Sequence, residues 1–274
     1  MFTLKTGIFH NVPEADYRSA MAIAGSDAKH ILPPKTPAHY AAHVAGETKR
    51  ETSRSMLLGT MAHVAVLEPT KLDTAFVEKP EGKEGDFRTK EGKEWKAKMG
   101  NTPILDAEET RAVRGIRDSI AAHKAARELL EGTQSEVAMF AQHRTELWIR
   151  GRVDALKDGV IVDVKTTSVG ADPAAFARHS FNLNYHFSAA WYCALARLNG
   201  MPDPAFYWIA VETSAPYAVS VYQIHPDALA LGTRLMNDAL ELIGQCEDNA
   251  TWPGYAEEIQ VLNLPPYAYK GGAA

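Results

Sequence analysis

Residues 148–168 read WIRGRVDALKDGVIVDVKTTS, and this stretch decides the fold. Two apolar, β-branched runs flank residues 157–159, Lys-Asp-Gly, and Asp-Gly between such runs is typical of a β-hairpin. Side chains alternate along a strand, so Asp163 and Lys165 share one face, and the hairpin brings Asp154 beside them. Two carboxylates and an ammonium are costly to bury without a partner. The pattern predicts a divalent cation there.

The triplet acid-x-Lys is uninformative by itself. With 15 lysines and 34 acids in 274 residues, chance alone predicts about two such triplets. Six occur, ending at Lys29, Lys49, Lys83, Lys93, Lys96 and Lys165. Only the last lies in a β-branched strand with another acid on the adjoining strand. The alternative interpretation is a salt bridge within the sheet.

Periodicity and turn signals give the expected element order. Helices are expected over 26–32, after Pro37, and over 57–67, 106–130, 173–179, 185–198 and 226–246. Strands are expected over 136–141, 146–156, 160–166, 206–212 and 218–224. This order predicts one α/β unit with a central mixed sheet flanked by helices.

The length of 274 residues allows one large domain or two small ones. We expect a single domain over 1–274, with a helical lead-in to about residue 55 and a motif-bearing core over about 136–245. The interval 78–100 mixes charges of both signs with glycines and is expected to be a mobile surface segment. A net charge of −5 means that DNA binding would need basic residues gathered on one surface.

The cysteine count and the apolar runs of the sequence indicate the compartment. Two cysteines, Cys193 and Cys246, are too few for a disulfide framework or a four-cysteine metal site. The N-terminal segment lacks the apolar core of a signal peptide, and no apolar run approaches the roughly 20 residues of a membrane helix. We therefore expect a cytoplasmic protein without a membrane association.

Several short motifs occur in an order that resembles a known family. The chain resembles the PD-(D/E)xK nuclease superfamily, and within it the RecE-type phage and prophage exonucleases (the nuclease domain of exodeoxyribonuclease VIII). The matching residues are Leu58 to His63 (LGTMAH), Leu67 to Pro69, Glu136, Gly151 to Ala155 (GRVDA), Asp163 to Thr167 (DVKTT), Tyr185-His186 through Tyr192, Val211-Glu212 and Pro216-Tyr217.

The resemblance implies a role for each motif residue. Asp154 and Asp163 would be catalytic carboxylates that ligate the metal, and Lys165 would be the catalytic lysine. The remaining metal ligands would be His63, the backbone carbonyl of Val164 and, in a second-metal position, Glu136. One or two Mg²⁺ or Mn²⁺ ions would occupy the site.

These roles suit phosphodiester hydrolysis. Mg²⁺ held by carboxylates neutralises the phosphate and lowers the pKa of water, while the lysine orients the water and offsets developing charge. From spacing alone, His63 is as well explained by a hydrogen-bonded core histidine. An imidazole ligand suits Mn²⁺ better than Mg²⁺.

Two positions depart from the family pattern. Ser188, four residues before Tyr192, stands where relatives tend to carry glutamine, which puts a glutamine-mediated contact to DNA or to the lysine in doubt. Val153 replaces the proline that usually precedes the first aspartate, a change suited to a strand.

Candidate DNA contacts lie in three places. Arg88, Lys90 and Lys93 belong to the glycine-interrupted charged segment, where Phe87 and Trp95 could stack on an exposed base; a solvated linker explains the same pattern. Arg150 and Arg152 alternate along a strand and would approach DNA near the metal, or pair with an acid. Ser188 and Tyr192 follow from the resemblance.

The resemblance further implies 5′ to 3′ digestion of linear double-stranded DNA for phage-type homologous recombination. It implies a ring tetramer, a single-strand-annealing partner, and a phage or prophage gene expressed in a bacterial host. Two alternatives stay open: a structure- or site-specific endonuclease on the same fold, and an inactive DNA-binding or assembly protein.

Overall fold

The computed structural model describes residues 4–48 and 53–265. Its strands are β1 (Gly7–Phe9), β2 (Ile23–Ala24), β3 (Val77–Glu78), β4 (Ile104–Leu105), β5 (Gln134–Gln142), β6 (Trp148–Lys157), β7 (Val160–Thr167), β8 (Ala205–Glu212) and β9 (Val219–Gln223). Its α-helices are α1 (Glu14–Ser19), α2 (Gly25–Ala28), α3 (Pro37–Val44), α4 (Arg54–Leu67), α5 (Leu72–Ala75), α6 (Lys90–Met99), α7 (Ala107–Ala122), α8 (Lys124–Leu130), α9 (Pro173–Asn182), α10 (Tyr185–Leu198) and α11 (Pro226–Asp248).

The central sheet is mixed, as the sequence predicts. Its strand order is β1-β5-β6-β7-β8-β9, with the short β2 added beside β6. The β7–β8 and β2–β6 pairs are parallel, and the other neighbours are antiparallel. Helices α9 and α10 form the crossover that a parallel β7–β8 pair requires.

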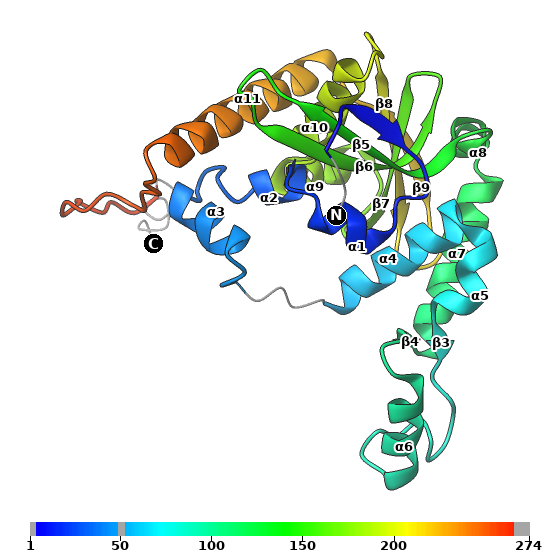
Figure 1. Ribbon diagram of the computed structural model, residues 1–274. Helices are drawn as coiled ribbons and strands as arrows, with labels where there is room; N and C mark the ends of the chain where they lie inside the picture. The colour runs from blue at the N-terminus through cyan, green and yellow to red at the C-terminus, as the bar shows by residue number, and fades with distance from the viewer. Residues whose placement is uncertain (1–3, 49–52, 266–274) are drawn as a thin grey trace, which may run out of the picture.

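Helices cover both faces of this sheet (Figure 1). On one face, Ile149 and Val153 of β6 pack in one cluster with Trp191 of α10. On the other, Val162 and Val164 of β7 pack with residues of α4 and α7. Each fully buried aliphatic side chain contributes roughly 1.5–3 kcal/mol to stability. The two core layers hold β6 and β7 between them.

One expectation needs correction, and one interval contains a helix that was not expected. The helix expected over 106–130 is broken at His123, whose backbone is extended and whose side chain caps α8 by accepting the Ala126 N–H. The interval 78–100 contains α6, which Thr89 caps by accepting the Gly92 N–H. The short parallel pair β3–β4 joins α6 to the body, and α6 projects away from the sheet (Figure 1).

Candidate metal centre

Strands β6 and β7 separate at the motif residues. They pair only from Ala155↔Val162 to Lys157↔Val160. Beyond that point, β6 pairs with β2 instead, through Ile149 and Arg150. Asp154 and Asp163 are therefore the first residues past the end of the β6–β7 ladder, one on each strand.

The Asp154 carboxylate lies in the opening between the strands. Its Oδ2 accepts the backbone N–H of Val164 at 2.8 Å. The N–H and C=O of one residue point to the same edge of a strand, so the carbonyl of Val164 faces this opening as well. The resemblance implies that both groups are metal ligands, which stays a prediction.

Helix α4 brings His63 to the same opening. Gly59 lies one turn before His63 and on the same helix face, and a Cβ there would sit 3.3 Å from Thr166 Oγ1 of β7. A glycine thus lets α4 approach the strand closely. As a result His63 Nδ1 lies 3.5 Å from Asp154 Oδ2.

Glu136 completes a three-residue cluster from the neighbouring strand. It lies opposite Asp154, between the pairs Ser135↔Ala155 and Val137↔Val153, at a step where the β5–β6 ladder is interrupted. Its φ of 53° is left-handed, a strained conformation for glutamate that is typical of functional sites. Ligand atoms of His63, Glu136 and Asp154 all lie within 4.8 Å of one another.

The electrostatics of this cluster favour a cation. Burial raises the pKa of Glu136 to about 7, the Asp154 charge adds to the rise, and His63 and Arg152 oppose it. Two carboxylates facing each other across a strand pair repel when both are ionised. A divalent cation would offset that repulsion, and one imidazole with two carboxylates suits Mg²⁺ or Mn²⁺.

Asp163 and Lys165 form a separate buried ion pair. Lys165 Nζ lies 2.7 Å from Asp163 Oδ1 and 2.6 Å from Oδ2, and the aspartate side chain is 4% exposed. Burial raises the pKa of Asp163, Lys165 counters this, and the charge of Asp154 raises it further. For Lys165, burial lowers the pKa, but Asp163 and Asp154 together outweigh burial and raise it above its usual value.

The sequence therefore predicts the shared face of Asp163 and Lys165 correctly, and three of the predicted metal ligands, His63, Glu136 and Asp154, lie close together. A Glu136 oxygen lies within 4.8 Å of an Asp154 oxygen, and Asp163 is held by Lys165. Asp163 Oδ2 is buried and, although close to the ammonium, makes no hydrogen bond of good geometry with any described residue. This under-satisfied oxygen fits a role for Asp163 as a further ligand.

One lysine near the site was missed from the sequence. Lys29 Nζ donates to the Leu183 carbonyl at 2.9 Å and lies 5.9 Å from the ring centroid of Tyr185, the ring that Lys165 also approaches. Burial lowers the pKa of Lys29 to about 8, and the charge of Lys165 contributes. The only sequence signal was its acid-x-Lys triplet, which chance explains.

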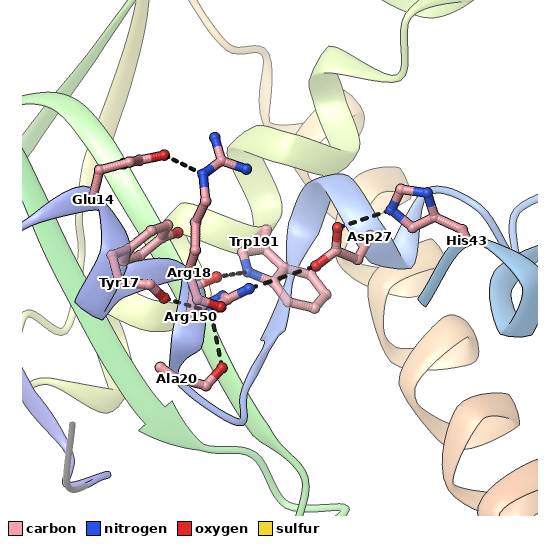
Figure 2. A network of polar contacts seen from close by, with 8 residues as sticks. All are labelled: Glu14, Tyr17, Arg18, Ala20, Asp27, His43, Arg150 and Trp191. Atoms are coloured by element: carbon pink, nitrogen blue, oxygen red, sulfur yellow. Dashed lines mark hydrogen bonds and ion pairs between the residues drawn. The ribbon is translucent and has the colours of Figure 1, made fainter. Parts of the chain in front are cut away.

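Arg150 is engaged within the protein (Figure 2). Its guanidinium donates to the backbone carbonyls of Tyr17, Arg18 and Ala20 and lies 3.9 Å from Asp27. Its own carbonyl accepts the indole N–H of Trp191 at 2.8 Å. These contacts tie the N-terminal segment to β6.

Arg152 has a similar position. It pairs with Glu14 at 2.6 Å, donates to the Val12 carbonyl and lies over the Tyr17 ring. The pairing with an acid, one of the two alternatives from the sequence, is thus observed. Contact of either arginine with DNA stays a prediction.

The remaining predicted DNA contacts lie in two places. Ser188 and Tyr192 line a cavity of about 500 Å³, together with Lys29, Arg150 and Arg152. Arg88, Lys90 and Lys93 are exposed near or on α6, away from the metal cluster. Arg88 is bound by both oxygens of Asp86, and Lys90 lies 3.8 Å from Glu94.

The mixed sheet, its two helical layers and the acidic motif define a nuclease-type PD-(D/E)xK fold, as the resemblance implies. A family model described as a PDDEXK-like domain of unknown function (DUF3799) matches residues 26–265, and the chain belongs to this family. No curated protein matches the chain.

A solved structure shares the fold. A "putative exonuclease" from Eubacterium rectale matches with a TM-score of 0.66 at 14% identity, covering 97% of this chain and all of that one. A phage-related exonuclease from Haemophilus somnus 129PT matches with a TM-score of 0.36 at 14% identity, over 84% of this chain and 96% of that one. Within the described residues, no helix has both the length and the apolar character needed to cross a bilayer.

Proposed function

We propose that the protein is a divalent-metal-dependent exonuclease that digests linear double-stranded DNA. The observation that carries the proposal is the meeting of two groups where β6 and β7 separate: the cluster of His63, Glu136 and Asp154, and the ion pair of Asp163 with Lys165. Carboxylates beside a buried ammonium provide both cation binding and phosphate stabilisation.

His63, Glu136 and Asp154 would hold the metal, with Asp163 and the Val164 carbonyl as further ligands. When bound, Mg²⁺ or Mn²⁺ supplies a Lewis acid for the phosphate and makes hydroxide accessible near neutral pH. With one ion, all three side chains would share it; with two ions, Glu136 would ligate the second.

Lys165 acts as a fixed positive charge. Burial lowers the pKa of Lys165, but Asp163 and Asp154 outweigh burial and raise it, which favours the charged ammonium in the metal-free protein. Asp163 positions the ammonium, which can then orient a water molecule and stabilise the negative charge that grows on the phosphate oxygens. The 20% exposure of the lysine side chain leaves it reachable from the opening.

Further parts of the proposal come from the family resemblance. Digestion runs 5′ to 3′ and produces single strands for homologous recombination, in a bacterial host carrying a phage or prophage gene. A homo-oligomeric ring and a single-strand-annealing partner complete this proposal. The name of the "putative exonuclease" described above supports an exonuclease over other activities.

The test compares end-labelled linear duplex with covalently closed circular DNA, with and without Mg²⁺ or Mn²⁺. We expect loss of the linear duplex only with metal, and an intact circle. Cleavage of the circle would instead identify an endonuclease. If neither DNA is digested with either metal, the nuclease proposal is wrong.

A further inference from the structure

The arm, defined as residues 77–105, carries some basic side chains that pair with an acid and others that do not. Arg88 donates to both carboxylate oxygens of Asp86 at 2.8 Å, and Lys90 lies 3.8 Å from Glu94, so an acid neutralises each of them. Within residues 4–48 and 53–265, neither Lys79 nor Lys96 has a carboxylate within 4 Å. Lys93 also lacks a carboxylate within 4 Å among these residues, so the unpaired positive charge of the arm includes Lys93 and extends to Lys79 and Lys96.

Lys79 and Lys96 both lie over the same aromatic ring. Lys79 Nζ lies 5.2 Å and Lys96 Nζ 5.3 Å from the centroid of the Phe87 ring. The Phe87 ring is held in turn by Trp95, stacked at 6.2 Å with an interplanar angle of 10°. Cation–π contacts orient the ammonium groups without cancelling their charge. Phe87 is thus occupied and is not free to stack on a base.

The two lysines line a cavity of about 380 Å³ at the base of the arm. Its wall includes Phe87, Arg54 and the turn Gly100 to Thr102. Asp106 also lines the cavity and caps α7 by accepting the Glu109 N–H, and Glu109 pairs with Arg54, so one carboxylate of the lining faces three cationic side chains. The cavity keeps a net positive lining, which suits an anionic ligand.

We propose that this cavity binds backbone phosphates of the DNA duplex on which the metal centre acts; the identity of the ligand rests on the proposed function. Helix α4 links the two places, because Arg54 lies at its first turn and His63 at the metal cluster. Arg54 and His63 are nine positions apart on this helix, which corresponds to a rise of about 14 Å along its axis. At 3.4 Å per phosphate along one strand, this is about four phosphates of a duplex.

The test measures binding of a fluorescein-labelled duplex by anisotropy, in EDTA, over a series of salt concentrations. Each lost phosphate contact lowers the salt slope of the binding constant by about 0.9, so Lys79→Gln/Lys96→Gln should lower it by about 1.8. The matched control, Arg88→Gln/Lys90→Gln, removes the same charge from the same arm and should lower the slope less than half as much. Equal changes in both variants, or no change in the first, would overturn the proposal.

Failure of this inference differs from failure of the proposed function. Binding is measured without metal, and digestion of linear duplex by the parent is followed separately. If the parent digests DNA but the Lys79→Gln/Lys96→Gln slope equals that of the parent, the cavity assignment is wrong and the nuclease stands. If the parent digests nothing while the slope falls as expected, the cavity stands and the catalytic proposal fails. Circular dichroism melting confirms that each variant is folded.

Discussion

At the scale of single residues, Glu136 of β5 and Asp154 of β6 face each other across a strand pair. The backbone of Glu136 is strained. Such a pair is costly without a cation. Alternation along a strand is enough to predict that Asp163 and Lys165 share a face. Alternation alone could not place Glu136 beside Asp154, because a left-handed residue inside a strand breaks the alternation; only the family resemblance pointed to Glu136.

Glu136→Gln should stabilise the metal-free protein more at high pH than at low pH. The pKa of Glu136 is raised from 4.5 to about 7, so between these values the folded state binds more protons than the unfolded state. The free energy of unfolding of the parent therefore falls as pH rises through this interval, and the amide removes that fall. Urea unfolding in EDTA at about pH 5 and about pH 8 measures the difference. If Glu136→Gln changes the free energy of unfolding equally at both pH values, the account is contradicted.

Lys165→Ala and Asp163→Ala should each reduce metal-dependent DNA digestion by about a hundredfold or more, because loss of a preorganised electrostatic group raises the barrier by several kcal/mol. Initial rates on end-labelled duplex measure the effect, with circular dichroism to confirm folding. If both variants digest DNA like the parent, the roles assigned to these residues are wrong.

At the scale of elements, the motif-bearing part of the chain was the most predictable. The expected strands and helices between residues 134 and 248 occur with shifted ends, because their apolar periodicity is regular. Helix α6 was missed because it packs few apolar residues and depends on the Thr89 cap and the Phe87–Trp95 stack. The break at His123 was missed because neither glycine nor proline marks it.

Two glycines of α11 provide a matched test of helix packing. A Cβ at Gly232 would lie 2.1 Å from the His186 carbonyl oxygen, whereas a Cβ at Gly244 would meet Leu147 at 4.0 Å. Gly232→Ala must push α10 and α11 apart and should cost about 1–3 kcal/mol or more. Gly244→Ala should gain up to about 1 kcal/mol from helix propensity. Urea unfolding measures both; similar effects would contradict the close approach of the two helices.

At the scale of the whole molecule, segments distant in sequence assemble the site. The N-terminal segment is fixed to β6 by Arg150 and Arg152, and α4 supplies His63 from outside the motif-bearing core. Local patterns cannot predict such contacts, because they are set by tertiary packing. With a net charge of −5, any DNA contact must be local, which makes the arm a sensible place for it.

Replacing residues 80–102 by a flexible Gly-Ser linker should leave the sheet folded, because β3 and β4 join the arm to the body. Duplex binding should then become less dependent on salt, because the replacement removes Lys96 and most of the cavity wall while Lys79 stays. Fluorescence anisotropy in EDTA measures this. An unchanged salt slope, with the melting temperature of the parent, would show that the arm does not contact DNA.

The central claim is that His63, Glu136 and Asp154 bind a divalent cation. Titration calorimetry of the purified protein with Mn²⁺ tests it most directly. The account predicts that the parent binds Mn²⁺ and that Asp154→Asn binds it about tenfold more weakly or worse, since a charged ligand is lost. A parent that binds no Mn²⁺, or an Asp154→Asn variant that binds it as tightly as the parent, would contradict the account.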